Sequence, residues 1–171
     1  MDLGAESRAG ADPDVHRRAI GAGKDANAAR SGGLSRAVND HYRYRVIYGD
    51  TDQMGVVYYA NYLRFFEGAR NEWIRRIGIP YREIEARGIM LPVYEASAQY
   101  LSPARYDDLI EVRMVVTHTR VKIRFEYKVH RVGDDAVLAL GHTVHVCVGK
   151  DGRPTRAPDW LLQALEGNRD G

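Results

Sequence analysis

Polar and apolar residues alternate with a period of two in several segments of the chain, and in one segment they recur with the period of an α-helix. In "YRYRVIY", from Tyr42 to Tyr48, tyrosine and valine share one face while arginine and isoleucine share the other. Residues 109–116 and 122–131 alternate in the same way, and 89–101 and 137–148 are also strand-like. The patterns predict half-exposed strands, and the nearly all-apolar 137–148 predicts a central strand of a sheet.

The helical period runs from residue 61 to 77. Asn61 is a suitable N-cap, and Gly78 followed by Pro80 is a typical stop. At 1.5 Å per residue this helix is roughly 25 Å long. The apolar residues that share one stripe of it are Tyr62, Phe65, Phe66, Ala69, Trp73 and Ile77. Shorter helical pieces are predicted at 80–88 and 160–165.

The order of these elements predicts an α+β fold. One strand precedes the long helix and four strands follow it, and short turns between the late strands make those pairs antiparallel. The helix must bury its aromatic stripe, and a five-stranded antiparallel sheet is the only large partner that the pattern offers. We therefore expect the helix to lie across one face of that sheet.

The first 40 residues differ in composition from the rest. They are rich in Ala, Gly, Arg and Asp and have almost no large apolar residues, so they cannot bury enough surface to offset the entropy of ordering. Residues 1–40 are predicted to be a disordered extension, 41–166 the folded domain and 167–171 a flexible tail. The "GAGKD" within the extension lacks the spacing of a phosphate-binding loop.

The amino-acid composition is that of a globular protein and gives no sign of a nucleic-acid-binding, membrane or disulfide-rich protein. Hydrophobic residues make up 44% and charged residues 28%, as in ordinary globular proteins. A net charge of +2 gives no reason to expect nucleic acid or an anionic membrane as a partner. No apolar run reaches the roughly 20 residues of a membrane helix, and no secretory-signal pattern opens the chain. With a single cysteine, Cys147, no internal disulfide is expected, and a cytoplasmic location is the default.

Several common catalytic arrangements are missing from the sequence. It has no G-x-S-x-G elbow, no cysteine pair and no H-E-x-x-H. His142 and His145 are three residues apart on a predicted strand, which sends them to opposite faces rather than to one metal. Cys147 stands among valines and is interpreted as a buried, unreactive thiol. We therefore expect no metal site and no cofactor.

Residues that could take part in catalysis are concentrated between the first strand and the long helix. We call this segment, residues 48–60, the joint. Asp50 and Asp52 are there, followed by Gly55. Turn or cap aspartates are common, so composition alone favours a structural role. However, glycine allows sharp bending or close approach of a ligand, and a helix N-terminus offers free N–H groups. A carboxylate beside such donors suits attack on a carbonyl whose oxygen becomes negative.

The segment "YGDTDQMGVVYYANYLRFFEGAR" resembles the signature of the 4-hydroxybenzoyl-CoA thioesterase family of hotdog-fold acyl-CoA thioesterases. "YLSPARYDDLIEV" and "VHVCVGKDGRPTRAP" extend the resemblance toward the branch found beside Tol-Pal envelope genes. The similarity covers about residues 42–165. It implies a hotdog fold, in which a long central helix packs on the sheet.

The resemblance also implies roles for residues of the joint. The second aspartate of D-x-D, Asp52, would act as nucleophile or general base on the thioester carbon. The main-chain N–H of Tyr59 would polarise the thioester carbonyl, with Gly55 shaping the loop between them. In the Tol-Pal-associated branch a histidine commonly stands at the position of Tyr59, so a mechanism using that imidazole is not expected here. Asp50 is expected to hold the loop.

Other residues are candidates for substrate binding. Tyr58, Tyr62 and Phe66 either line an acyl pocket or pack in the core. Arg120 and Lys122 either bind CoA phosphates, as basic residues near this position do in the family, or form a solvated face.

Arg105 and Glu67 each have both a functional and a structural interpretation. Arg105 either serves CoA phosphates in the same way or pairs with a nearby aspartate. Glu67, on the helix, is expected to form an ion pair rather than to replace Asp52, although some hotdog thioesterases use a helix glutamate.

The implied function is hydrolysis of an acyl-CoA, or of an acyl carrier protein thioester, without metal or redox cofactor. The family also implies a homo-oligomer, a dimer joined edge to edge or a homotetramer, and an exposed sheet edge favours such a partner. One alternative is an acyl-thioester dehydratase, which would need a histidine at the joint. Another is a non-catalytic acyl-CoA or acyl carrier protein binding module, which would keep the pocket without needing Asp52.

Overall fold

The computed structural model describes residues 35–37 and 41–167 of the chain. Its helices and strands, in chain order, are β1 (Ser35–Ala37), β2 (Tyr42–Arg45), the 3₁₀ turn η1 (Tyr48–Asp50), α2 (Asn61–Arg76), α3 (Tyr81–Ala86), β3 (Val93–Tyr100), β4 (Leu109–His118), β5 (Lys122–Arg131), β6 (Val137–Val146) and α4 (Asp159–Glu166).

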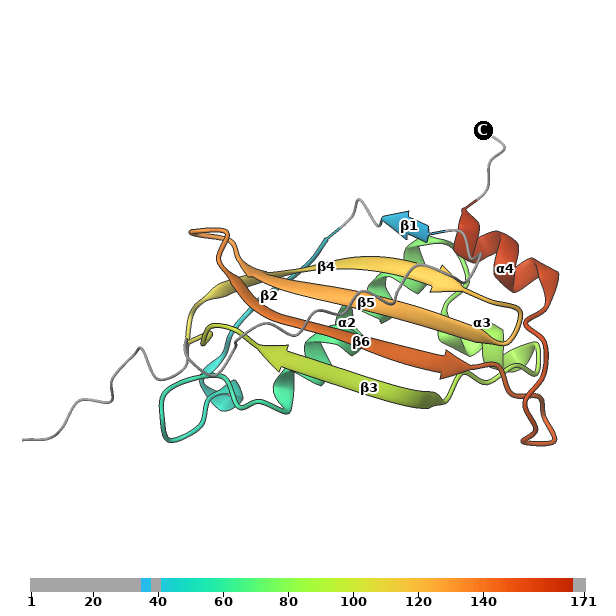
Figure 1. Ribbon diagram of the computed structural model, residues 1–171, viewed down its shortest axis with the longest axis horizontal. Coiled ribbons are helices and arrows are strands. Elements are labelled where there is room, and N and C mark those ends of the chain that lie inside the picture. Colours follow the sequence, from blue (N-terminus) through green and yellow to red (C-terminus); the bar gives the residue numbers. More distant parts are fainter. Residues whose placement is uncertain (1–34, 38–40, 168–171) are drawn as a thin grey trace, which may run out of the picture. The chain divides into compact units, whose positions relative to one another are not determined.

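The strands form one antiparallel sheet in the order β1-β4-β5-β6-β3, with β2 also paired to β4 (Figure 1). The predicted antiparallel pairing of the late strands is confirmed, and β6 lies between β5 and β3 as its apolar sequence predicted. Strand β1 is an addition, because Ser35–Ala37 lie inside the range predicted to be disordered. The other residues of that range before 41, and 168–171 of the tail, lie outside the described residues.

Helix α2 crosses one face of the sheet, behind the strands in Figure 1. Its aromatic stripe is buried as predicted, and Phe66 has no exposed surface. Its ring stacks on Tyr127 of β5, with centroids 4.4 Å apart. A Cβ at Gly141 of β6 would clash with the Phe66 ring, with Cζ only 2.6 Å away, so the absence of a side chain at Gly141 allows the helix to approach the sheet. None of the helices in the described segments is long and apolar enough to cross a membrane.

Two details of the predicted strand and helix ends are wrong. The N-cap of α2 is Ala60, and Asn61 is the first helical residue, whose side-chain amide donates to the carbonyl of Asp50 at 2.9 Å instead. Strand β2 ends at Arg45, because the chain turns into η1, and this leaves Tyr48 80% exposed rather than on the inward face.

Strand β3 forms an open edge of the sheet. Among the described residues it pairs only with β6, and all but one of its eight residues are exposed. Its outer backbone N–H and C=O groups are therefore available for pairing with another strand.

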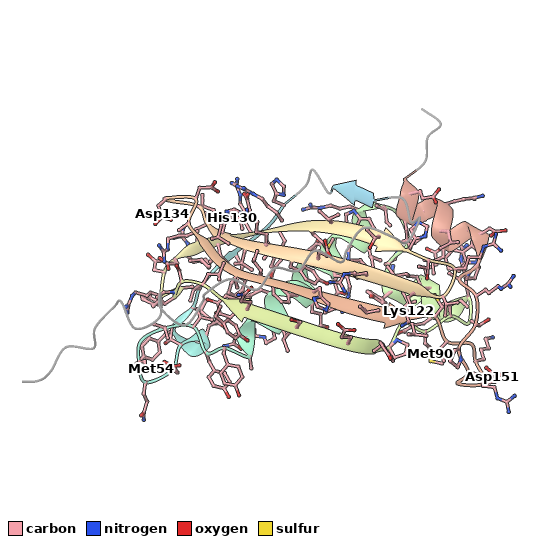
Figure 2. The ribbon with its side chains drawn as sticks, in the orientation of Figure 1. Met54, Met90, Lys122, His130, Asp134 and Asp151 are labelled. Atoms are coloured by element: carbon pink, nitrogen blue, oxygen red, sulfur yellow. The ribbon has the colours of Figure 1, made fainter. Side chains whose placement is uncertain are left out.

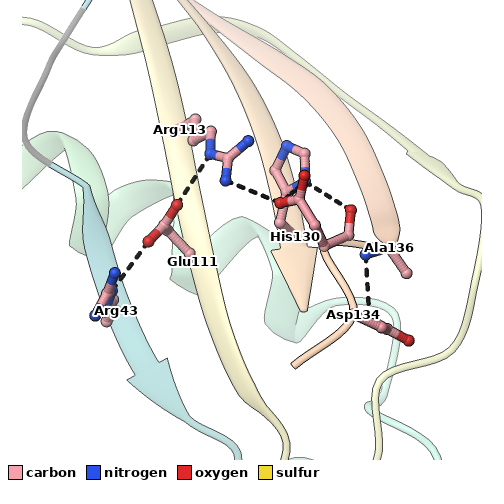
Figure 3. Close-up of polar contacts among 7 residues, drawn as sticks. Arg43, Glu111, Arg113, His130, Asp134 and Ala136 are labelled. Atoms are coloured by element: carbon pink, nitrogen blue, oxygen red, sulfur yellow. Dashed lines mark hydrogen bonds and ion pairs between the residues drawn. The ribbon is translucent and has the colours of Figure 1, made fainter. Parts of the chain in front are cut away.

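The opposite face of the sheet carries a buried carboxylate, Glu111 of β4 (Figure 3). Its side chain is 6% exposed and accepts from Arg43 at 2.9 Å and from Arg113 at 2.9 Å. Arg113 also reaches Asp135, whose carboxylate lies 3.2 Å from the buried His130. Burial acts to raise the pKa of Glu111, but its two arginine partners hold that pKa below its ordinary value of 4.5.

Glu111→Gln is expected to lower the free energy of unfolding at pH 7 by about 1.5–3 kcal/mol, because it removes two charge-assisted hydrogen bonds. A carboxyl with a lowered folded-state pKa stabilises the fold above its unfolded pKa and stops doing so as the pH falls through the folded value. The difference between variant and wild type should therefore shrink as the pH falls below 4.5. Urea denaturation of wild type and variant at pH 7 and pH 4 measures this difference in the free energy of unfolding.

The matched control is Glu126→Gln, since Glu126 is exposed on β5 and paired with Arg124. It should change stability by no more than about 0.5 kcal/mol. An equal loss at both pH values for Glu111→Gln would contradict the assigned role of its charge.

Candidate active site

The joint is organised around the buried carboxylate of Asp50, which is 1% exposed. It accepts hydrogen bonds from the Tyr44 hydroxyl at 2.8 Å, the Ile47 N–H at 3.0 Å and the Arg64 guanidinium at 3.2 Å. Its main-chain carbonyl accepts the N–H of Tyr58 at 2.9 Å. Asp50 thus ties the end of β2, the loop and the start of α2 together, and the prediction that it holds the loop is confirmed.

Asp52 is half-buried and lies in the tight turn that follows. Its N–H donates to the carbonyl of Val56 at 2.9 Å, and its carbonyl accepts from the N–H of Gly55 at 2.9 Å. Gly55 closes the turn with φ +70°, a conformation that glycine adopts without strain.

Only one carboxylate oxygen of Asp52 takes part in the turn. Oδ1 accepts the N–H of Met54 at 2.8 Å, whereas Oδ2 has no hydrogen-bond partner among the described residues. One oxygen therefore fixes the side chain, and the other is available to a substrate.

Tyr59 lies two residues before the start of α2. The N–H groups of Asn61 and Tyr62 donate to the carbonyls of Tyr58 and Tyr59 at 2.9 and 3.3 Å. The N–H of Tyr59 itself has no acceptor in the described part of the chain. Such a main-chain donor at the beginning of a helix is suited to a developing negative charge.

An aromatic cluster surrounds this donor. The rings of Tyr58 and Tyr59 lie 4.5 Å apart, and Tyr100 of β3 lies 6.4 Å from Tyr59 and donates its hydroxyl to the Tyr59 carbonyl at 3.1 Å. The neighbouring Tyr59 phenol raises the pKa of Tyr58, and the Asp52 carboxylate adds to this effect. Asp52 and the tyrosines therefore belong to one electrostatic environment.

Tyr100 was missed by the sequence analysis. The sequence predicts a strand over residues 89–101 without placing Tyr100 near the joint, and only the fold brings the end of β3 there. Tyr62 packs against Tyr100 with ring centroids 5.2 Å apart and is itself 3% exposed. Tyr62 and Phe66 thus lie in the core of this subunit, while Tyr58, 43% exposed, faces outward at the joint.

The basic candidates divide into two groups. Arg105 lies at the joint, where its guanidinium is 3.5 Å from the carbonyl oxygen of Gly55. Lys122 lies at the opposite end of the sheet from Met54 of the joint loop (Figure 2) and stacks over the Tyr94 ring at 4.4 Å. Arg120 lies two residues before Lys122 in the sequence. Within one subunit, therefore, Arg120 and Lys122 are not brought together with Asp52.

The remaining candidates stand apart from the joint. His145 is buried under α2, and His142 pairs with Glu95 at 2.6 Å on the other face, as their spacing predicted. Cys147 is fully buried, which raises the pKa of its thiol to about 11. Glu67 is exposed and forms no ion pair among the described residues, so its predicted structural pairing is not observed.

A long helix lying across an antiparallel sheet is the architecture of the hotdog fold. The sequence pattern of the Thioesterase-like superfamily matches residues 46–165. The chain belongs to this superfamily, and the family expected from the sequence is confirmed.

Individual relatives agree with this assignment. The chain is 31% identical over 134 residues to the 1,4-dihydroxy-2-naphthoyl-CoA hydrolase of Thermosynechococcus vestitus, covering 73% of this chain and 90% of that protein. It is 38% identical over 76 residues to the acyl-CoA thioester hydrolase YbgC of Escherichia coli O157:H7, covering 44% and 57%. A crystal structure of a hypothetical protein from Thermus thermophilus superimposes with a TM-score of 0.69 at 37% identity, covering 74% and 96%.

Proposed function

We propose that this protein hydrolyses an acyl-CoA thioester at the joint, to a free carboxylic acid and CoA. The supporting observation concerns two groups that have no hydrogen-bond partner within residues 35–37 and 41–167. They are one carboxylate oxygen of Asp52 and, at the end of the turn that follows, the N–H of Tyr59. The N–H polarises the thioester carbonyl, and Asp52 acts on its carbon as nucleophile or as general base for water. The names of the relatives support a CoA thioester as substrate.

The aromatic cluster supplies a surface for the acyl group. Tyr58 and Tyr59 are 43% and 59% exposed, and Tyr100 at the end of β3 is 39% exposed. These flat rings suit aromatic as well as aliphatic acyl groups. Arg105, beside Gly55, is placed to attract the negative charge of CoA.

We propose further that the working unit is a dimer joined through β3. A twofold axis across this open edge would pair two copies of β3 antiparallel, so the Val93 end of one strand meets the Tyr100 end of the other. Lys122 of the partner subunit would then approach the joint of this one. In this arrangement, Arg120 and Lys122 of the partner subunit would lie near Asp52. The tetramer and the cytoplasmic location stay predictions.

Release of free thiol from a panel of acyl-CoAs tests the activity. The panel should contain short and long aliphatic chains and benzoyl-type rings, together with one acyl carrier protein thioester. We expect protein treated with a metal chelator to release thiol from at least one CoA thioester. Its molecular mass in sedimentation should be that of two subunits or of a multiple of two. Saturable binding of acyl-CoA without thiol release would instead favour the non-catalytic binding module.

A further inference from the structure

A pocket lies between α2 and α3, away from the joint. Its volume is about 540 Å³, and none of the joint residues lines it. The side chains that matter for its chemistry are Glu67, Arg70, Arg75, Tyr81, Arg82 and Glu85. The function proposed above uses none of them.

Arg70 is the unusual member of this set. It is only 8% exposed, its Nε has no hydrogen-bond partner, and no carboxylate among the described residues forms an ion pair with it. Its guanidinium lies 5.7 Å from the centre of the Tyr81 ring and 5.9 Å from that of Phe125. Arginine does not deprotonate in proteins, and a buried charge without a compensating anion is unfavourable. Cation–π contacts compensate only part of this.

The sheet side of Arg70 cannot supply the missing negative charge. A directed hydrogen-bond chain runs there from the Tyr127 hydroxyl to Thr143 at 2.9 Å and from Thr143 to Nε2 of His145 at 3.1 Å. Because Nδ1 of His145 faces the carbonyl of Leu91 at 2.9 Å, it must be the donor, and Nε2 the acceptor. Burial, together with the nearby Arg70 charge, lowers the pKa of His145 to about 4. The three hydrogen-bonded side chains, Tyr127, Thr143 and His145, are therefore all neutral at pH 7.

The pocket side offers a second unpartnered donor. The hydroxyl of Tyr81 is buried and meets no hydrogen-bond partner of good geometry among the described residues. Burial raises its pKa, and the neighbouring Arg70 guanidinium opposes that rise. Tyr81 and Arg70 line the same pocket. The Glu67 and Glu85 carboxylates line the same pocket, but neither forms an ion pair with Arg70 in the described part of the chain. Two buried donors in one cavity that lack a bonded acceptor are the pattern expected of a site for a bound acceptor.

We propose that this pocket binds the carboxylate of a small organic acid, held by the Arg70 guanidinium and the Tyr81 hydroxyl. A guanidinium matches the planar, singly charged carboxylate. Glu67 and Glu85 line the same pocket and repel a phosphate dianion more strongly than a carboxylate. Arg75 is already paired with Glu72, so the buried Arg70 carries the recognition.

Binding of sodium benzoate to the full-length protein, measured by calorimetry and by NMR titration, tests the site. Benzamide is the neutral control of the same shape, and inorganic phosphate is the competing anion. We expect saturable benzoate binding, at least roughly tenfold tighter than that of benzamide or phosphate. No thioester is present, so the result is independent of the hydrolysis proposed for the joint.

Variants locate the binding. Tyr81→Phe should weaken benzoate binding roughly fivefold by removing one donor, and Arg70→Met roughly 30-fold or more by removing the charge. Tyr106→Phe is the matched control, because Tyr106 is exposed and lies outside the pocket, and it should leave affinity unchanged.

Three results would overturn the proposal. The first is a wild-type protein that does not bind benzoate, and the second is equal binding of benzamide. The third is benzoate affinity that survives Tyr81→Phe unchanged, which remains decisive even if Arg70→Met fails to fold.

Discussion

Asp52→Asn is expected to lower kcat for thioester hydrolysis at least ~100-fold, which corresponds to about 2.7 kcal/mol of transition-state stabilisation. Asparagine has the same shape and keeps a carbonyl oxygen that accepts the Met54 N–H, as Oδ1 of Asp52 does at 2.8 Å. The turn should therefore survive. What is lost is the second carboxylate oxygen, which serves as nucleophile or base, so the effect should fall on kcat.

Asp151→Asn is the matched control for this experiment. Its carboxylate also accepts a main-chain N–H two residues ahead, that of Arg153 at 3.1 Å, and it lies at the far end of the molecule from Met54 (Figure 2). This variant should hydrolyse at the wild-type rate. The catalytic assignment of Asp52 is rejected if Asp52→Asn keeps activity within threefold of wild type while remaining folded.

Gly141→Ala is expected to destabilise the fold by about 3 kcal/mol, at the upper end for adding a methyl group to a packed core. The new Cβ would lie 2.6 Å from Cζ of the Phe66 ring and 2.6 Å from the carbonyl oxygen of Ser97. The ring cannot retreat, because it is stacked on Tyr127, and the carbonyl belongs to the paired strand β3. The midpoint of thermal unfolding should fall by about 6–12 °C.

Gly133→Ala is the control for backbone entropy, since nothing lies within 4 Å of a Cβ at that position. It should change stability by no more than about 1 kcal/mol. Adding Phe66→Leu should reduce the additional cost of Gly141→Ala by about 1 kcal/mol, because the shorter side chain leaves room for the methyl group. Equal costs of Gly141→Ala in both backgrounds would show that the Phe66 contact does not set the helix–sheet distance.

The elements themselves follow from local periodicity. Strand β5 runs from Lys122 to Arg131 as its alternation predicted, and α2 ends one residue before the predicted Ile77. Asp52 and Tyr59 are seven positions apart in sequence, so their neighbourhood also followed from a short motif. These features depend on contacts between near neighbours in the chain, which a sequence shows directly.

Arg70 marks the limit of that reasoning. It is not one of the apolar residues of the helical stripe, yet it stands four residues after Phe66 and three before Trp73 and is only 8% exposed. A charged residue at this spacing can therefore be buried with the stripe. That it lacks an ionic partner could be recognised only when α3 and the sheet were in place.

The sequence by itself determined the class of fold, the aromatic stripe that α2 buries, and the carboxylate and main-chain donor of the joint. Only the tertiary structure decided that β3 is an open edge, that Tyr100 reaches the joint, and that Lys122 lies at the other end of the sheet. The physical reason is that strand order and sheet edges arise from pairing between residues far apart in the chain. Side-chain alternation gives the face on which a residue lies but not its neighbour on the next strand.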